Sequence, residues 1–508
     1  MQPIVLARVR SAALLGVEAI PVDVEVDVGP GLPGYHLVGL PMGSVKEGSV
    51  RIRGALENSG YRMPPRKVTV NLAPADLRKD GAAYDLPIAV GVLAAQGHLR
   101  PDRVLDFLLL GELGLDGGLR PVRGALPAAA LAARMGLQGV LLPERSAREA
   151  AVIAGVDSFA VTHLSEVVTF LSGERPAAPC APLEMAPEMQ SGEDLADVSG
   201  QERAKRALEI AAAGGHALLL VGPPGTGKTM LARRLATLLP PLTVDEAIET
   251  SAVHSVAGIL DGRGLVRRRP VRAPHHTISD VGMVGGGTPP RPGEISLAHH
   301  GVLFLDELPE FRRSSLEALR QPLEDGQIRL TRARYTVTLP SRATLVAAMN
   351  PCPCGHYGDA RRTCTCTPGQ VQRYRSRVSG PLLDRIDLHV DVPGMSYARL
   401  MSGGGETSDV VRVRVERARA VQQQRLRATR MHTNAQMPAS ALDRFAPLGP
   451  AGHRLFELAV RRLGLSARAV GRIRRVARTI ADLAGSPGME TSHLAEAIQY
   501  RVLDREVA

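Results

Sequence analysis

Short apolar runs alternate with helical patterns over the first third of the chain. Val22–Val28 alternates valine with acidic residues, the period of two that is typical of a half-buried strand. Lys67–Val70 and Val104–Leu110 also read as strands, and the alanine-rich Leu126–Met135 predicts a helix. We therefore expect an α/β or α+β domain over residues 1–172.

Two changes of texture divide the rest of the chain. Residues 173–193 contain four prolines and little periodicity, which indicates a linker. From residue 194 the pattern becomes strand, glycine-rich loop and helix, and this predicts an α/β core over 194–400. After Gly403–Gly405 the chain is helical and basic, so we expect a helical lid over 401–508.

A phosphate-binding motif follows the first strand of this core. The apolar strand Ala217–Val221 leads into a G-x-x-x-x-G-K-T run, and Met230–Leu239 continues as a helix. Backbone N–H groups of such a loop curl around phosphates, the lysine neutralises charge and the threonine hydroxyl holds Mg²⁺. The predicted ATP-binding residues are Gly222, Pro223, Pro224, Gly225, Thr226, Gly227, Lys228 and Thr229. An ordinary glycine-rich turn is the alternative.

Two further apolar strands end in polar residues suited to ATP hydrolysis. The strand that begins at Gly301 ends in Asp306 and Glu307, and the strand from Thr344 ends in Asn350. We expect Asp306 to bind Mg²⁺ and Glu307 to orient or deprotonate the attacking water. Asn350 would position that water. The alternative for the acidic pair is a strand ending in two solvated carboxylates.

These parts together resemble the AAA+ ATPases over residues 195–500. The resemblance implies that Arg385 is an arginine finger, which reaches the ATP of a neighbouring subunit, and that Arg468 of the lid contacts the γ-phosphate. The rivals are Arg373, Arg375 and Arg377 for the finger and Arg472 for the lid arginine. A finger that acts in trans requires a ring, which in this family is usually a hexamer.

Two segments indicate a particular subgroup of that family. Leu323–Arg332 followed by Tyr335–Leu339 predicts a β-hairpin, and a glycine-rich insert, Arg272–Gly293, precedes Asp306. Both resemble the pore loops of magnesium-chelatase ATPase subunits and of replicative MCM helicases. Several histidines offer metal ligands but lack ligand spacing: His254, His275, His276, His299 and His300.

Four of the five cysteines lie close together in the sequence. They form two C-x-C pairs, Cys352 with Cys354 and Cys364 with Cys366. Four thiolates on two short turns suit a tetrahedral structural Zn²⁺ site. His356 could replace one ligand, and free buried thiols or a redox pair are the alternatives. The arm of the segment 351–367 carries Arg361, Arg362, Arg373, Arg375 and Arg377, so we expect a basic prong, or simply arginines on a solvated loop.

Charge and composition favour a polyanionic partner. The net charge is +11, of which +8 falls after residue 400, and the chain holds 57 arginines but only five lysines. Lys228 is one of those five. Aromatic residues make up only 3%, so contacts to nucleic acid would be made to phosphates more than by base stacking. No apolar run is long enough to span a membrane, and we expect a cytoplasmic protein.

The N-terminal domain resembles the proteolytic domain of Lon proteases. The likeness rests on the runs Arg78–Ile88, Gly111–Leu113, Arg120–Gly124 and Leu142–Arg145. That family's nucleophilic serine corresponds to Ala83 and its catalytic lysine falls near Leu126. Neither side chain can serve as a nucleophile or a base, so we expect the fold without peptidase activity.

The whole chain, with its cysteine segment inside a chelatase-type AAA+ module, resembles the ComM/YifB family. The resemblance implies a hexameric, ATP-driven DNA helicase or translocase that promotes branch migration during natural transformation, with ATP and Mg²⁺ as cofactors and DNA as partner. A magnesium-chelatase motor subunit and a protein-remodelling ATPase are the alternatives. A chelatase motor would need a partner subunit, since this chain has no integrin-like metal-adhesion domain.

Overall fold

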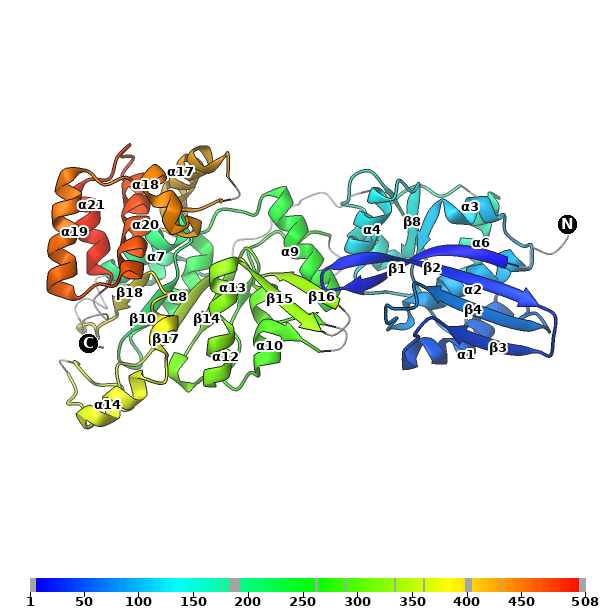
Figure 1. Cartoon of the computed structure of the whole chain (residues 1–508), viewed down its shortest axis with the longest axis horizontal. Coiled ribbons are helices and arrows are strands. Elements are labelled where there is room, and N and C mark those ends of the chain that lie inside the picture. Colours follow the sequence, from blue (N-terminus) through cyan, green and yellow to red (C-terminus); the bar gives the residue numbers. More distant parts are fainter. Residues whose placement is uncertain are drawn as a thin grey trace.

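The computed structural model describes residues 6–174, 176–181, 192–260, 264–287, 290–332, 335–359, 361–397, 404–429 and 431–501. Parts of several predicted segments lie outside these ranges. They include Arg175 and residues 182–191 of the linker, 288–289 of the insert, 333–334 of the hairpin, Ala360, residues 261–263 and 398–400 of the core, and 401–403, 430 and 502–508 of the expected lid. Figure 1 shows an elongated molecule, with a large sheet at the N-terminal end, a parallel sheet in the middle and a group of helices at the other end.

The N-terminal sheet has seven strands in the order β3-β4-β2-β1-β5-β8-β9. Alternate residues of β5 face opposite layers of helices: Phe107 and Leu109 join the apolar cluster that contains Ile88, whereas Leu108 joins the cluster of Ala128. Both faces are therefore covered. Its strands are β1 (Leu6–Leu15), β2 (Glu18–Gly29), β3 (Gly34–Val38), β4 (Lys67–Ala73), β5 (Phe107–Leu109), β8 (Gly139–Pro143) and β9 (Asp157–Val161), with a small ribbon of β6 (Glu112–Leu113) and β7 (Leu119–Arg120).

Helices complete the N-terminal layers. They are α1 (Gly43–Asn58), α2 (Asp85–Ala95), α3 (Pro101–Leu105), α4 (Ala125–Arg134), α5 (Glu144–Ala150) and α6 (Leu164–Ser172), with the short 3₁₀ turn η1 (Ala82–Tyr84). The predicted strand Val104–Leu110 is wrong in its first part. Pro101 opens a helix that ends at Leu105, because a proline at the first turn has no N–H to lose, and only Phe107–Leu109 is extended.

The central sheet is parallel throughout, in the order β11-β14-β17-β10-β18. Its strands are β10 (Leu218–Val221), β11 (Val271–Arg272), β14 (Val302–Leu305), β17 (Thr344–Met349) and β18 (Leu388–Asp391). The three central strands, β14, β17 and β10, are nearly continuous apolar runs, as expected where both faces are buried. The predicted strands before the phosphate-binding loop, Asp306 and Asn350 are confirmed as β10, β14 and β17. All three end at the same edge of the sheet.

Helices and two ribbons surround this sheet. The helices are α7 (Glu202–Gly214), α8 (Lys228–Leu238), α9 (Val244–Ala257), α10 (Asp280–Val284), α11 (Glu294–Leu297), α12 (Arg313–Ala318), α13 (Arg320–Asp325), α14 (Pro368–Arg375) and α15 (Gly380–Leu383), with η2 (Leu195–Asp197) and η3 (Leu308–Glu310). The insert forms the small ribbon β12 (Gly285–Gly286) and β13 (Arg291–Pro292). The predicted hairpin is β15 (Gln327–Arg332) with β16 (Tyr335–Pro340), and Leu323 belongs to α13 instead.

The C-terminal part is helical, as its periodicity predicts. Its elements are α17 (Ser408–Leu426), η4 (Asn434–Gln436), η5 (Ala439–Ala441), α18 (Leu442–Phe445), α19 (Pro450–Leu463), α20 (Ala467–Leu483) and α21 (Thr491–Gln499). Ile473 and Val476 of α20 belong to one apolar cluster with Leu208 of α7 and Leu218 of β10. The C-terminal helices and the sheet therefore share a continuous core.

The N-terminal and central parts also touch directly. The backbone N–H of Gly124, before α4, donates to the carbonyl of Ser255 in α9 at 3.2 Å. The Ser255 hydroxyl in turn donates to Glu149 at 3.3 Å. Burial raises the pKa of Glu149 to about 7. Leu15 and Val17, at the turn between β1 and β2, pack against the apolar cluster beneath the β15–β16 hairpin.

No helix in the described ranges combines the length and the apolar character that crossing a membrane requires.

Candidate functional site

The phosphate-binding loop joins the end of β10 to the start of α8. Gly225 and Gly227 adopt φ values of 74° and 87°, in the left-handed region that glycine enters without strain. Gly222 is required for a different reason, since a Cβ there would lie 2.2 Å from the Val392 carbonyl oxygen. The loop therefore curls tightly before α8, whose positive N-terminal end faces the same space.

The Lys228 ammonium lies at the centre of this loop. Its Nζ donates to the carbonyl oxygens of Gly222 at 2.7 Å and Pro223 at 2.9 Å, and to Oδ1 of Asn350 at 3.1 Å. Burial lowers the pKa of Lys228, and the nearby Asp306 opposes that effect. The structure thus brings the predicted lysine and asparagine together.

Asp306 and Glu307 follow β14 on the other side of β17. The Thr229 hydroxyl donates to Oδ2 of Asp306 at 2.7 Å, and the Glu307 backbone N–H donates to its Oδ1 at 2.9 Å. Hydroxyl and carboxylate oxygens of this kind are ligands that suit Mg²⁺. Asp306, Glu307 and Asn350 follow the ends of β14 and β17. They therefore lie at the same edge of the sheet as the phosphate-binding loop.

Glu307 has an unusual backbone. Its φ is 54°, a left-handed value that costs a residue with a Cβ about 1 kcal/mol or more. The side chain is 60% exposed, and a carboxylate oxygen lies 3.5 Å from Nδ1 of His276. From the sequence His276 is only a possible metal ligand, and nothing in the spacing between His276 and Glu307 predicts that they meet.

Arg385 lies at the opposite edge of the sheet from the loop. It precedes β18, whose first residue pairs with Leu218 at the start of β10. Four strand residues, about 13 Å, separate that edge from the phosphate-binding loop of the same chain. The guanidinium pairs with Glu324 at 2.7 Å and donates to the Pro381 carbonyl at 2.7 Å, and its side chain is 9% exposed.

The rival finger residues have other surroundings. Arg377 pairs with Glu310 at 3.0 Å. Arg375 donates to the Pro351 carbonyl at 3.2 Å and covers the ring of Tyr357 at 5.2 Å from its centroid. Arg373 is exposed on α14. Arg375 is thus beside the chain's own phosphate-binding edge, unlike Arg385.

Arg468 and Arg472 lie one turn apart on α20. Arg472 donates to Oδ1 of Asp387 at 2.6 Å and to the Arg385 carbonyl at 2.9 Å, whereas Arg468 is exposed. Burial alone would raise the pKa of Asp387, but Arg472 and His216 together hold it below its usual range. The geometry thus ties Arg472 to the segment that carries Arg385.

The four clustered cysteines converge as the spacing predicts. Their Sγ atoms all lie within 4.8 Å of one another, and Cys352 is 3.4 Å from Cys354 and 3.7 Å from Cys364. Four thiolates around Zn²⁺ at about 2.3 Å would be about 3.8 Å apart, so the donor set fits the ion. Backbone N–H groups of Cys354, Tyr357 and Cys366 also point at the sulfurs. His356 instead contacts Asp359.

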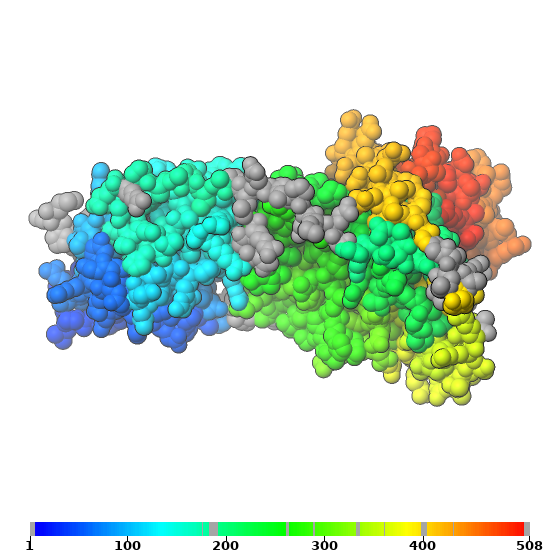
Figure 2. Space-filling view, turned by 180° about the vertical axis from the view of Figure 1, so that it is seen from behind, coloured from blue at the N-terminus to red at the C-terminus, as the bar shows by residue number. Residues whose placement is uncertain are grey.

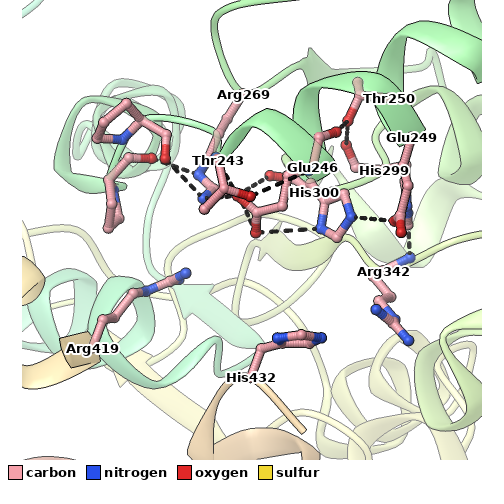
Figure 3. A network of polar contacts seen from close by, with 12 residues as sticks. Thr243, Glu246, Glu249, Thr250, Arg269, His299, His300, Arg342, Arg419 and His432 are labelled. Atoms are coloured by element: carbon pink, nitrogen blue, oxygen red, sulfur yellow. Dashed lines mark hydrogen bonds and ion pairs between the residues drawn. The ribbon is translucent and has the colours of Figure 1, made fainter. Parts of the chain in front are cut away.

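A second cluster of ligand-type residues lies near the amino edge of the sheet. Glu249, His299 and His300 approach within 4.8 Å, and Figure 3 shows His300 between Glu246 and Glu249. Nδ1 of His299 accepts the Arg342 backbone N–H at 3.0 Å, so its Nε2 carries the proton that it shares with Glu249 at 3.1 Å. A protonated Nε2 cannot bind a metal, and His299 is a hydrogen-bonded core residue.

A cavity around Ala83 lies between the N-terminal and central parts. It has a volume of about 400 Å³, and its lining includes Arg78 and Arg123 from one part and Val256 from the other. Leu126 is fully buried and lines a different cavity between the same two parts. The two positions expected from the Lon resemblance therefore do not share one cavity.

Comparisons with known proteins cover nearly the whole chain. Three family profiles match in succession: "Subunit ChlI of Mg-chelatase" over residues 24–146, "Magnesium chelatase, subunit ChlI" over 194–400 and its C-terminal part over 405–501. A YifB protein of Salmonella typhimurium is 47% identical over 98% of both chains. The competence protein ComM of Haemophilus influenzae is 46% identical, again over 98% of both chains. The chain belongs to the ComM/YifB family.

Membership in this family indicates the kind of chemistry that the site performs. The ComM/YifB chains are magnesium-chelatase-like, of the AAA+ type, and this indicates an ATPase that uses ATP with Mg²⁺. The phosphate-binding loop and the acidic pair at its edge agree with that class.

Proposed function

We propose that the chain is one subunit of a ring-forming, ATP-driven DNA helicase or translocase that promotes branch migration, as in natural transformation. The observation that supports the proposal is that the proposed ATP-site residues lie at two opposite edges of the sheet. Lys228, Asp306, Glu307 and Asn350 gather at its carboxyl edge, and Arg385 lies at the other edge. A site with its loop on one subunit and its finger on the next requires several copies to work together.

The residues take the following roles in this proposal. Lys228 neutralises the β- and γ-phosphates, and Thr229 with Asp306 holds Mg²⁺, which offsets charge on the phosphates when bound. Glu307 follows β14 at the same edge of the sheet as the phosphate-binding loop, and its side chain is exposed. It accepts a proton from the attacking water. Asn350, 3.1 Å from Lys228, positions that water. Arg385 of one subunit stabilises charge on the nucleotide of the next, and Arg468 contacts the γ-phosphate.

DNA is the proposed partner for reasons of charge and shape. The segment that includes α14 protrudes from the body in Figures 1 and 2 and displays the exposed Arg362 and Arg373. One face of the β15–β16 hairpin adds a second exposed element, with Arg329 and Thr331 exposed on it. The relative from Haemophilus influenzae is named a competence protein, which fits handling of incoming DNA.

We further infer that residues 1–172 form a Lon-like domain without peptidase activity, joined through 173–193 to the ATPase core of 194–400 and the lid of 401–508. Ala83 has no nucleophilic atom, and Leu126 has no basic one.

A magnesium-chelatase motor is the second candidate, because the matching family profiles carry that description. It requires a metal- and porphyrin-binding partner subunit, whereas the helicase requires DNA. A protein-remodelling ATPase remains the third, and a client captured by a Glu307→Gln trap would identify it.

The decisive experiment measures ATPase activity and branch migration with single-stranded, duplex and forked DNA. Stimulation by DNA and migration of a synthetic junction are expected for the natural protein. Glu307→Gln should bind ATP without turnover, and Lys228→Ala should lose binding. A protein with neither DNA-stimulated hydrolysis nor branch migration would refute the helicase.

A further inference from the structure

The four-cysteine knuckle, residues 351–367, packs directly against the phosphate-binding loop. It begins immediately after Asn350, so it starts at the same edge of the sheet as the loop. Gly355 then abuts Pro224: a Cβ at Gly355 would lie 2.6 Å from Cδ and 2.8 Å from Cγ of that proline. These two chain segments, which are 131 positions apart, therefore meet without room for one added carbon.

A second contact reaches the loop from its other flank. The Arg361 guanidinium packs beside Gly394, in the segment after β18. The neighbouring Val392 carbonyl is the group that closes against Gly222, and the Pro393 carbonyl accepts a hydrogen bond from Gln201 at 2.8 Å. The knuckle therefore touches both the loop itself and the segment that supports its first glycine.

Little apolar packing holds the knuckle in shape. Among its described residues after Pro351, only Cys352 and Gly355 are buried, and Tyr357 is 47% exposed. A loop of this length without an apolar core does not hold one conformation by packing alone. The four sulfurs, within 4.8 Å of one another, are its internal anchor, and a Zn²⁺ ion that joins them would fix the position of Gly355.

We propose that the metal-bound knuckle is a positioning element of the ATP site: it holds Pro224 and the phosphate-binding loop in the conformation that accepts nucleotide, so loss of the metal lowers the affinity for ATP. This inference rests on the proposed ATPase function and assigns that site a structural metal requirement. Gly355 is the positioning residue, and it touches neither the nucleotide nor the metal.

Gly355 has a matched control within the same knuckle. Gly355 and Gly358 have φ values of 85° and 75°, so alanine pays a similar backbone cost at both. No atom of the residues that the structure describes lies within 4 Å of the Cβ position at Gly358, whereas Pro224 blocks the position at Gly355. A difference between Gly355→Ala and Gly358→Ala therefore reports the contact with the loop.

The experiment uses the full-length chain and two readouts, zinc content by elemental analysis and the Kd of a fluorescent ATP analogue. Gly355→Ala should keep about one zinc per chain and bind the analogue about tenfold more weakly or worse. Gly358→Ala should match the natural protein in both. Removing zinc from the natural protein with a chelator should weaken binding to a similar degree, and zinc should restore it.

Two results would overturn the inference. One is a Gly355→Ala protein that binds the analogue within twofold of the natural protein. The other is a zinc-free natural protein that binds it as tightly as the zinc-loaded form, which decides the matter even if Gly355→Ala fails to fold. If the natural, zinc-loaded protein bound no ATP at all, the proposed ATPase function would fail instead.

Discussion

At the scale of single residues, three of the proposed site residues are paired with neighbours that limit their freedom. Lys228 is held by three oxygens, Asp306 by Thr229, and Arg385 by Glu324. The last pair matters most, because Arg385 is only 9% exposed and so cannot extend to a neighbouring subunit while it holds Glu324. Glu324 is the second-last residue of α13, directly before the β15–β16 hairpin. A movement of the hairpin would therefore act on Arg385, the proposed finger.

Glu324→Gln should raise ATP hydrolysis in the absence of DNA. The lost ion pair, with a carboxylate that is 48% exposed, is worth up to about 1 kcal/mol, so we expect an increase of about two- to fivefold. Steady-state ATPase rates with and without DNA measure it. The double variant with Arg385→Ala should show no gain, because the effect passes through the finger. A lower rate in Glu324→Gln would mean that Glu324 assists Arg385.

His299 should make stability depend on pH. Burial lowers its folded-state pKa from 6.5 to about 4, in a setting shared with Glu249, His300 and Arg342. Between these pH values the imidazole is protonated in the unfolded chain but not in the folded one. The free energy of unfolding therefore falls as the pH drops from 6.5 toward 4, by up to about 1.4 kcal/mol per pH unit.

His299→Asn isolates that contribution. The asparagine oxygen can still accept the Arg342 N–H that Nδ1 of His299 accepts at 3.0 Å, but it does not titrate. Urea unfolding at pH 7 and pH 5 should show a smaller loss for His299→Asn than for the natural protein. Equal losses would assign the pH dependence to other groups.

At the scale of elements, α20 connects the lid to the segment that carries Arg385. Arg472 joins Asp387, which also bonds His216 at 3.1 Å, and His216 bonds Thr479 farther along the same helix at 2.8 Å. A helix fixed to the sheet at two points moves with it. The C-terminal helices and the segment that carries Arg385 therefore form one unit.

Arg472→Gln should destabilise the chain by about 3 kcal/mol, because it leaves the buried Asp387 carboxylate without its charged partner. Arg468→Gln, on the exposed side one turn earlier, should change stability by less than about 0.5 kcal/mol. Urea denaturation of the two variants gives the comparison. If both changed stability equally, the pair with Asp387 would carry no special weight.

The elements also show where sequence reasoning succeeds. Strands β10, β14 and β17 are continuous apolar runs with a polar residue at the end, so both their positions and the gathering of Lys228, Asp306 and Asn350 follow from the pattern. The strand predicted to begin at Val104 is wrong in its first part, because Pro101 opens a helix there. The apolar residues of that helix also fit a strand pattern. Contacts such as Gly355 with Pro224 and Glu324 with Arg385 join residues far apart in sequence, and no local pattern encodes them.

At the scale of the whole molecule, positive charge is uneven. The lid and the protruding knuckle carry most of the excess, whereas the N-terminal sheet is distant from both in Figure 1. With only 3% aromatic residues, binding of DNA should depend on phosphate contacts and hence on salt.

The affinity for DNA should fall linearly on a log–log plot against salt concentration. Arg362→Ala and Arg373→Ala, both exposed near the knuckle, should each lower the slope by about 0.7 for single strands or about 0.9 for duplex. Arg8→Ala, whose guanidinium pairs with Glu25 on the N-terminal sheet, is the control and should leave the slope unchanged. Fluorescence anisotropy at several salt concentrations measures all three. Equal slopes throughout would place the DNA elsewhere.

Arg385 and the phosphate-binding loop lie at opposite edges of the sheet, and this placement determines how many complete ATP sites an assembly of copies contains. Under the proposed trans role, an open arc of copies always ends in one loop without a finger and one finger without a loop. Each added copy completes one site, but the contact that closes the arc completes a site without adding a copy. Closure is then the step at which the hydrolysis rate per chain reaches its maximum.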